Sequence, residues 1–323
     1  MQRPLSSSRI SLSGLLTTAG ALASFATLTG FAGRWWFFDL AAHFRVQYAM
    51  ALGLGALVML AWRQPLWAAV FAGFALINAA ILAPRFLGSA EAVTGISGPI
   101  FRVLLANVHS DNRDRERIRR VIAEANPDVI VLLEVTPWLI AQLADLADRY
   151  PHRIAEPQEG NFGIALFSRL PLRNTAVISL GPAGLPSLKV EVEADGRRFT
   201  VVGTHPLPPI GAAMTGDRNA QLADLARLAQ QTRQTGQPLL ALGDFNLSPW
   251  SPHFAQLLAD SGLRDSAAGR GIQPSWPVGW PPLWIPIDHV LYSDGIQIRH
   301  RVIGPDLGSD HYPVIVDFQV AGS

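Results

Sequence analysis

The chain has 323 residues and a formal net charge of +1, and 49% of its residues are hydrophobic. It contains no cysteine, which excludes disulfide bonds, cysteine-based metal sites and a cysteine nucleophile. The longest apolar stretches lie near the N-terminus, so the two ends of the chain are expected to differ in structure.

Three runs without a charged residue fill most of the first 94 residues. They cover residues 10–33, 46–62 and 64–84 and contain 24, 17 and 21 residues. A helix needs about 20 apolar residues to cross a bilayer, with a range of about 17–25, so each run is long enough. Aromatic residues lie at the ends of the runs, as is usual at a membrane surface. We therefore predict a membrane anchor in residues 1–94, with three transmembrane helices.

Two other interpretations of this region stay open. The runs could form a buried helical hairpin in a soluble protein, or the first could be a signal peptide, because Arg3 and Arg9 precede an apolar stretch that ends in Ala-Leu-Ala. The positive charges do not fix the orientation, since three fall on each side of the membrane. The short turn at residues 63–65 is easiest to keep in the cytoplasm. We expect a multi-pass protein of a bacterial inner membrane, with its C-terminal domain on the extracytoplasmic side.

Residues 95–323 have the composition of a soluble α/β domain. They contain 20 of the 26 basic residues and 23 of the 25 acidic residues, which gives a net charge of −3, and Lys189 is their only lysine. A protein that binds long nucleic acid by neutralising phosphates would be expected to be basic. The composition therefore argues against such a protein.

Helices and strands of this domain can be assigned from hydrophobic periodicity. Strands are expected at 101–108, 128–135, 161–168, 238–245, 285–292, 296–303 and 312–320, with a hairpin at 187–205. Helices are expected at 114–125, 136–150, 215–233 and 251–262. Strands and helices alternate early and hairpins are interleaved, which predicts two sheets packed face to face with helices outside.

Six of these strands carry a carboxylate, amide or imidazole side chain where the apolar run begins or stops. These residues are Asn107 and His109, Glu134, His205, Asp244 and Asn246, Asp288 and His289, and Asp310 and His311. Each alone could be structural, for example in a turn, but six together indicate an active site. Oxygen ligands suit Mg²⁺ or Mn²⁺, and His–acid pairs can activate water or hold a phosphoryl oxygen. The set predicts metal-assisted hydrolysis of a phosphoester.

In this order, the segments resemble the endonuclease/exonuclease/phosphatase (DNase I-like) superfamily. The resemblance rests on LLANV, VIVLLEV, GIALFSRLPL, VVGTHP, LLALGDFNLSPWS, IPIDHVL and GSDHYPVIVDF. It spans about residues 100–320 and implies a four-layer α/β sandwich with the active site at one edge of the two sheets. The expected architecture is therefore three transmembrane helices followed by a catalytic domain at residues 95–323.

The resemblance implies a metal-binding set. Glu134 would be the principal ligand of a Mg²⁺ or Mn²⁺ ion, and Asn107 beside it would contact the metal or the phosphate. Asp310 would be a second carboxylate on the metal side.

It also implies a set of catalytic residues. Asp244 would position or deprotonate the attacking water, and Asn246 would hold the phosphoryl oxygen in the transition state. His311 would contact the scissile phosphate and be oriented by Asp288. His205 would be a phosphate ligand or a general acid.

A Pro-rich loop ahead of Asp288 contains Trp276, Trp280 and Trp284. These side chains could stack on a base, enter a membrane surface or simply hold the loop in place. We predict that Trp276 and Trp280 contact the substrate.

Three functions stay open. The first is a membrane-anchored, Mg²⁺-dependent phosphodiesterase or phosphatase that acts on small or lipid-linked phosphoesters. The second is a membrane-tethered nuclease, but the net charge of −3 in residues 95–323 favours the first function over this one. The third is an inactive scaffold. A scaffold should have lost at least one of Glu134, Asp244, Asn246 and His311, and all four are present. The bilayer and a phosphoester are the expected partners, and the residues imply no protein partner.

Overall fold

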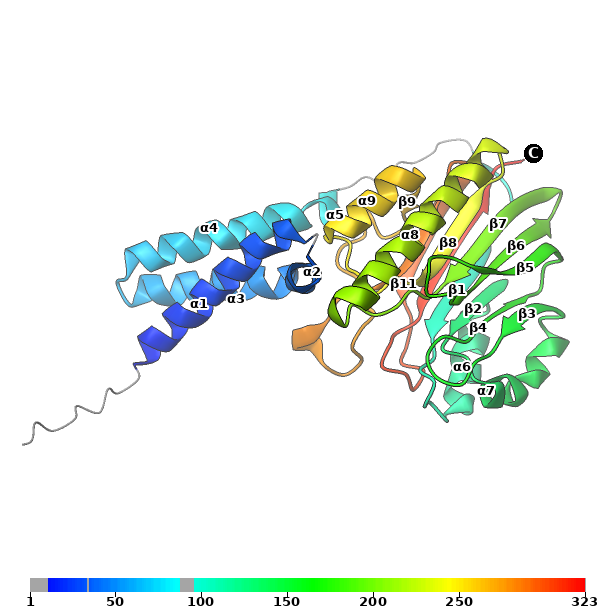
Figure 1. The fold of residues 1–323 in the computed structure, drawn as a ribbon, viewed down its shortest axis with the longest axis horizontal. Coiled ribbons are helices and arrows are strands. Elements are labelled where there is room, and N and C mark those ends of the chain that lie inside the picture. The colour runs from blue at the N-terminus through cyan, green and yellow to red at the C-terminus, as the bar shows by residue number, and fades with distance from the viewer. Residues whose placement is uncertain (1–10, 34, 88–95, 323) are drawn as a thin grey trace, which may run out of the picture.

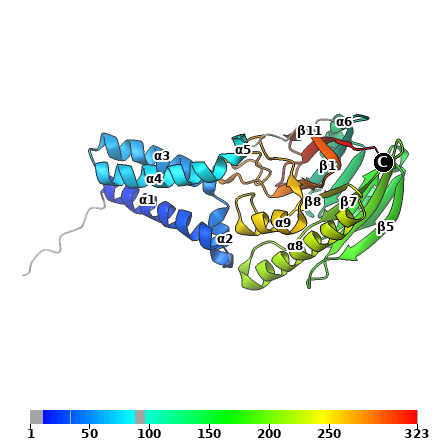
Figure 2. The same ribbon diagram turned by 90° about the horizontal axis from the view of Figure 1, so that it is seen from above.

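The computed structural model describes residues 11–33, 35–87 and 96–322. A bundle of N-terminal helices, here called the helical arm (residues 11–87), projects from one end of a larger α/β domain (Figures 1 and 2). The predicted domain boundary at residues 94 and 95 lies outside the described residues, as does the first residue of the first predicted membrane span.

The helical arm is built mainly from three long helices. Its α-helices are α1 (Leu12–Thr29), α2 (Trp36–Ala42), α3 (Arg45–Ala61), α4 (Pro65–Leu82) and α5 (Pro84–Leu87). Ser11 caps α1 by accepting a hydrogen bond from the Gly14 amide, and Pro65 occupies the first turn of α4. Met59 and Phe71 are fully buried where α3 packs against α4. Local capping therefore fixes where these helices begin, and a small apolar core packs α3 against α4.

Two helical segments of the arm are long and apolar enough to cross a membrane. They are Leu12–Ala32 and Pro65–Leu87. The remaining predicted span corresponds to α3, which forms a bent pair with α2 at an angle of 61°. The described residues thus contain two candidate spans, or three if the bent pair is one.

Helix α2 was not expected from the sequence, and it joins the arm to the domain. Its Asp39 forms an ion pair with Arg218 and accepts a hydrogen bond from Ser251 Oγ at 2.6 Å. The indole of Trp250 donates to the carbonyl of His43 at 3.1 Å. A second contact pairs Arg85 with Asp265 at 2.7 Å. The arm is therefore docked on the domain through buried polar contacts.

The domain contains two six-stranded mixed sheets. The first has the order β11 (Ile296–Ile303), β12 (Val314–Val320), β1 (Phe101–Asn107), β2 (Val129–Leu133), β4 (Ile164–Ser168) and β3 (His152–Glu156). The second has the order β5 (Leu172–Ser179), β6 (Pro186–Ala194), β7 (Arg197–Thr204), β8 (Leu239–Asp244), β10 (Asp288–Tyr292) and β9 (Arg264–Asp265). Only β1–β2 and β7–β8 pair in parallel among these strands. Each parallel pair brings two carboxyl ends to one edge of its sheet.

Helices cover the outer faces of both sheets, which confirms the predicted layers (Figure 1). Helices α6 (Arg115–Ala125) and α7 (Pro137–Gln142) cover the first sheet, and α8 (Gly211–Gln234) and α9 (Pro252–Ser261) cover the second. The central core lies between the sheets. In β12, Val314, Val316 and Phe318 face this core while Ile315 faces the helices, as the alternating sequence predicts.

Strands β3 and β5 were missed because they are edge strands. Both carry mixed polar and apolar residues and are largely half-buried or exposed, so neither shows a clear period of two. The helix expected at 136–150 ends at Gln142 and continues as a 3₁₀ turn (Ala144–Asp148). Helix α8 begins four residues earlier than expected, at Gly211.

Candidate active site

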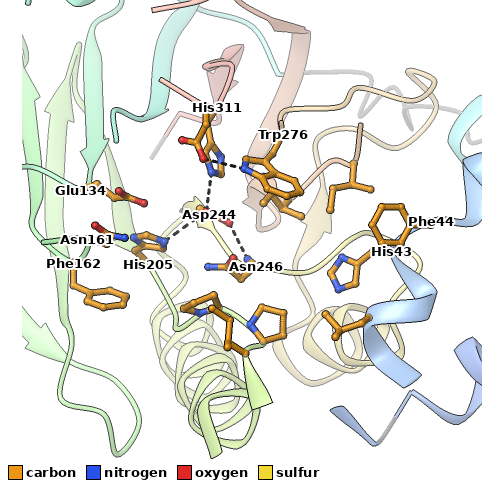
Figure 3. Close-up of a pocket in the computed structure, with 17 residues that line it drawn as sticks. His43, Phe44, Glu134, Asn161, Phe162, His205, Asp244, Asn246, Trp276 and His311 are labelled. Carbon is orange, nitrogen blue, oxygen red and sulfur yellow. Dashed lines mark hydrogen bonds and ion pairs between the residues drawn. The ribbon is translucent and has the colours of Figure 1, made fainter. Parts of the chain in front are cut away.

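Most of the polar residues predicted at strand ends converge on one edge of the domain (Figure 3). In the first sheet Asn107 ends β1 and Glu134 directly follows β2, and the loop before β12 carries His311. In the second sheet His205 directly follows β7, Asp244 ends β8 and Asp288 begins β10. Most of these side chains line or lie directly behind one pocket of about 390 Å³.

Asp244 lies at the centre of this arrangement. Its Oδ2 atom is 3.6 Å from Nε2 of His205 and 3.6 Å from Nε2 of His311. The Asn107 amide donates to the same oxygen at 3.4 Å, and the backbone amide of Asn246 donates to Oδ1 at 2.9 Å. A buried carboxylate between two imidazoles can accept a proton from a water molecule held in the pocket.

The side chain of His311 is held by a second acid. Its Nδ1 atom is 2.8 Å from Oδ2 of Asp288, and both side chains are buried. Burial is the largest influence and lowers the pKa of His311, but the carboxylates of Asp288 and Asp244 outweigh it and raise the pKa to about 10. His311 is therefore a cation at neutral pH, with Nε2 directed toward Asp244.

The neighbouring groups also have shifted pKa values. Burial raises the pKa of Asp244, but His311 and His205 outweigh it and leave the pKa lowered. Burial lowers the pKa of His205, but Asp244 and Glu134 outweigh it and leave the pKa raised. The site therefore combines an ionised carboxylate with two imidazoles that favour their protonated form.

Glu134 is held rigidly on the other side of the pocket. Its Oε1 accepts from the Asn107 amide at 2.9 Å and its Oε2 from the Ser110 backbone amide at 3.1 Å. Its backbone is left-handed, with φ of 60°, and Asn246 is also left-handed, with φ of 53°. Such conformations are costly for residues other than glycine and are often found in active sites.

The environment of Glu134 fits a bound cation. Glu134 is 7% exposed, and within the described residues no Lys or Arg forms an ion pair with it. A buried carboxylate without a cationic side chain is costly, so a bound cation would compensate its charge. The Asn107 nitrogen faces Glu134, and the Asn107 oxygen accepts from the His109 amide at 3.1 Å. Asp244, Asp288 and His311 also offer ligand atoms within 4.8 Å of one another. In that group, however, the positive charge of protonated His311 already compensates the negative charge of Asp244 and Asp288.

The other predicted residues have different surroundings. Asp310 lines the pocket, is exposed, and accepts a hydrogen bond from the Trp276 indole at 3.0 Å. Trp276 lines the pocket as well, whereas Trp280 is 66% exposed and is not part of the lining. His289 packs against Phe254 and bonds to the Leu247 carbonyl at 2.8 Å, away from the pocket. The roles of Asp310, Trp276 and Trp280 stay predictions.

The part of the pocket that comes from the helical arm was not predicted from the sequence. Leu40, His43 and Phe44 line the pocket, and Figure 3 shows His43 and Phe44 opposite the catalytic edge. Asn161 and Phe162, between β3 and β4, complete another side. The sequence does contain one signal for the docked arm. Asp39 is the only acid in the first 90 residues, and an acid within an apolar segment usually has a buried partner.

The fold and the convergence of these side chains fit a hydrolase that acts on ester bonds, of the phosphoesterase and nuclease class. Residues 104–311 match the Endonuclease/Exonuclease/phosphatase family, which is well over half of the chain. The chain belongs to this family.

Individual relatives agree with this assignment. Nocturnin of Drosophila melanogaster is 31% identical over 260 residues, which cover 62% of this chain and only 40% of Nocturnin. The human Nocturnin catalytic domain with bound sulfate has a TM-score of 0.57 at 23% identity, over 70% of this chain and 97% of that one. The 3′ phosphatase NExo from Neisseria, bound to a product DNA hairpin, has a TM-score of 0.57 at 19% identity, over 68% and 99%. These two structures share the fold.

Proposed function

We propose that the protein is a membrane-anchored phosphoesterase that depends on a divalent cation and hydrolyses a phosphoester with water. The observation that carries the proposal is the position of Asp244, 3.6 Å from both His205 and His311 in a pocket that also contains Glu134. In this proposal Asp244 is the proton acceptor and the imidazoles of His205 and His311 are donors, and the pocket volume of about 390 Å³ supports it because a phosphate fits there.

Each protein group has a defined task in the proposed reaction. Asp244 orients a water molecule and accepts its proton. The imidazolium of His311, held by Asp288, donates a hydrogen bond from Nε2 to a phosphoryl oxygen and stabilises the charge that develops there. His205 donates to the phosphate or protonates the leaving oxygen. Asn246 lines the same pocket and offers its amide to the phosphoryl group.

Glu134 and Asn107 would hold the divalent cation, with Asp310 as a second carboxylate. Mg²⁺ and Mn²⁺ suit these oxygen donors. The cation would neutralise charge on the phosphoryl group.

The surface of the helical arm supports membrane anchoring. Leu22, Leu54, Leu66 and Leu76 on α1, α3 and α4 are all more than 60% exposed. Exposed apolar surface of this extent is unfavourable in water but suits contact with lipid. The helices would therefore cross the membrane, with the α/β domain at one surface.

Contacts of two arginines favour an extracytoplasmic domain. Arg45 is buried and donates to the Thr27 carbonyl and to Asn78, and Arg85 is paired with Asp265. Both arginines therefore have partners, and both lie at the end of the arm that contacts the domain. Arg63 is exposed at the opposite end, in the turn between α3 and α4. Among the arginines of the arm that the structure describes, Arg63 is thus the one without a partner at either end, which favours a cytoplasmic position for its turn.

The proposal is tested with the full-length protein in detergent. Hydrolysis of bis-p-nitrophenyl phosphate should need Mg²⁺ or Mn²⁺ and stop on addition of EDTA, and the protein should remain in membranes after carbonate extraction. Undiminished hydrolysis in EDTA would contradict the metal assignment. Release by carbonate would contradict the anchor. Linear DNA in the same assay tests the nuclease alternative.

A further inference from the structure

The pocket lining combines two unlike sets of side chains. One set is the charged residues of the catalytic edge. The other set is aliphatic and aromatic, and it includes Leu40 and Phe44 from the helical arm, Ile210 before α8, and Ile285 and Ile287 before β10. Figure 3 shows the arm residue Phe44 across the pocket from Glu134 and His205. A ligand that fills this space would place a phosphate beside the first set and an apolar group beside the second.

The charges of the lining fit a ligand with a single phosphate. No Lys or Arg is among the lining residues of the described chain. Among the described lining residues, the only basic side chains are thus imidazoles. Polyanions such as nucleic acids bind mainly through several Lys or Arg contacts to successive phosphates. The lining therefore favours a phosphoester whose remaining part is uncharged and apolar.

His43 of the arm adds a buried imidazole to the pocket lining. The residue is 4% exposed, and neither ring nitrogen has a hydrogen-bond partner among the described residues. Both nitrogens are buried, so a ligand in the pocket would meet the carbon atoms of the ring.

Exposed apolar side chains occur in the pocket lining, in a neighbouring loop and on the arm. Ile210 lines the pocket and is 71% exposed. Trp280 and Leu283, in the loop that follows the pocket residue Trp276, are exposed too. On the arm, Trp35 and Phe37 are exposed at the start of α2. Aromatic and aliphatic side chains that point outward beside candidate membrane spans are typical of a membrane surface.

From these observations we propose that the substrate is an amphiphilic phosphoester of the membrane, with its phosphate between His205 and His311 and its apolar chain against Leu40, Phe44 and Ile210. This inference rests on the phosphoesterase activity proposed above. Water adds its oxygen to phosphorus, the ester P–O bond breaks, and one proton passes to the leaving alcohol. The helical arm would thus form one wall of the substrate site in addition to holding the enzyme at the lipid.

The inference is tested with two synthetic esters that differ only in their chain. Methyl p-nitrophenyl phosphate and octyl p-nitrophenyl phosphate have the same leaving group, and both are assayed with full-length protein in nanodiscs with Mg²⁺. Each buried methylene contributes about a factor of four, so burial of three or four methylenes should raise kcat/KM by about 100-fold for the octyl ester. Thymidine 5′-p-nitrophenyl phosphate serves as the nucleoside comparison.

Variants locate the effect in the pocket. Ile210→Ser should lower the octyl-to-methyl ratio by about tenfold, and Phe44→Ser should do the same. Val177→Ser, an exposed apolar position on β5, is the matched control and should leave both rates unchanged. A ratio near one, or faster hydrolysis of the thymidine ester, would overturn the lipid inference while the phosphoesterase proposal stands. If the protein hydrolyses none of the three esters, the phosphoesterase proposal itself is overturned.

Discussion

Arg218 Nη2 lies 2.7 Å from Asp39 Oδ2, and both side chains are fully buried. Asp39 belongs to helix α2 of the arm and Arg218 to helix α8 of the domain. The same guanidinium donates from Nη1 to the carbonyl of Asn246 at 3.0 Å. One ion pair therefore connects the helical arm to a residue of the candidate active site.

Removal of one charge of this pair should destabilise the whole protein. Asp39→Asn should lower the free energy of unfolding by about 3–5 kcal/mol, because Arg218 would then be a buried charge without a counter-ion. It should also lower kcat, since Arg218 holds the backbone at Asn246. Urea denaturation in detergent, monitored by tryptophan fluorescence, measures the change in the free energy of unfolding. Glu193→Gln removes an exposed partner of Arg173 and is the matched control, with an expected loss below about 1 kcal/mol. Equal small losses in both variants would contradict this interpretation.

The pair formed by Asp288 and His311 should act as one unit in catalysis. His311→Ala and Asp288→Asn should each lower kcat by about 10²–10⁴-fold, because each removes the oriented imidazolium at the phosphate. The double variant should be only slightly slower than His311→Ala, since the second change removes nothing further. Steady-state kinetics on bis-p-nitrophenyl phosphate compare the three. Multiplicative losses would show that the two residues act independently.

Glu134 should control the affinity for the divalent cation. Glu134→Gln keeps the shape of the side chain but removes its charge, so the Mg²⁺ concentration for half-maximal rate should rise by at least about tenfold. A smaller rise is expected for Asp310→Asn, because Asp310 is exposed. Titration of the rate with Mg²⁺ measures both, and Glu156→Gln on the edge strand β3 is the control. An unchanged Mg²⁺ dependence in Glu134→Gln would remove this residue from the metal site.

His289 should make stability depend on pH. Burial is the main cause that lowers its pKa to about 4, and its ring lies between Phe245 and Phe254. In the unfolded chain its pKa is about 6.5, so between pH 6.5 and 4 the unfolded state binds a proton that the folded state does not. The contribution of His289 to stability should therefore fall by about 3 kcal/mol as the pH drops through this range, and it should not change at higher pH.

The His289→Gln variant should lose most of this dependence. Apparent unfolding temperatures in detergent, measured from pH 7.5 to 4, compare it with the unaltered protein. His152→Gln, on the edge strand β3 and half-buried, is the matched histidine control and should leave the slope unchanged. An identical slope for His289→Gln and the unaltered protein would rule out this source.

The central strands could be predicted from the sequence because their environment is uniform. Residues 129–133 and 239–244 are buried on both faces, and such strands require continuous apolar runs. The polar residue at which each run stops then marks the edge of the sheet. Glu134, Asp244 and His205 were found in this way. Their assembly into one site followed from the fold, since parallel strands end at the same edge.

The contribution of the arm could not be predicted in the same way. Every residue of α2 except Asp39 is apolar, so no period of 3.6 distinguishes its buried face from its exposed one. The partner of Asp39 is 179 residues away in the chain, and no local pattern specifies such a pairing. His43 and Phe44 reach the pocket only because this pairing docks α2 against the domain.

The two sheets share one order of strand pairings: antiparallel, antiparallel, parallel, antiparallel, antiparallel. The domain thus has an internal repeat of topology, in which β1 corresponds to β7 and β2 corresponds to β8. Glu134 follows β2, and Asp244 ends β8, so the two acids occupy nearly equivalent places in the two halves. Amides donate to both acids, but two imidazoles also lie beside Asp244. The proposed division between a cation-binding half and a proton-transferring half would therefore arise from these imidazoles, because the two halves share the same order of strands.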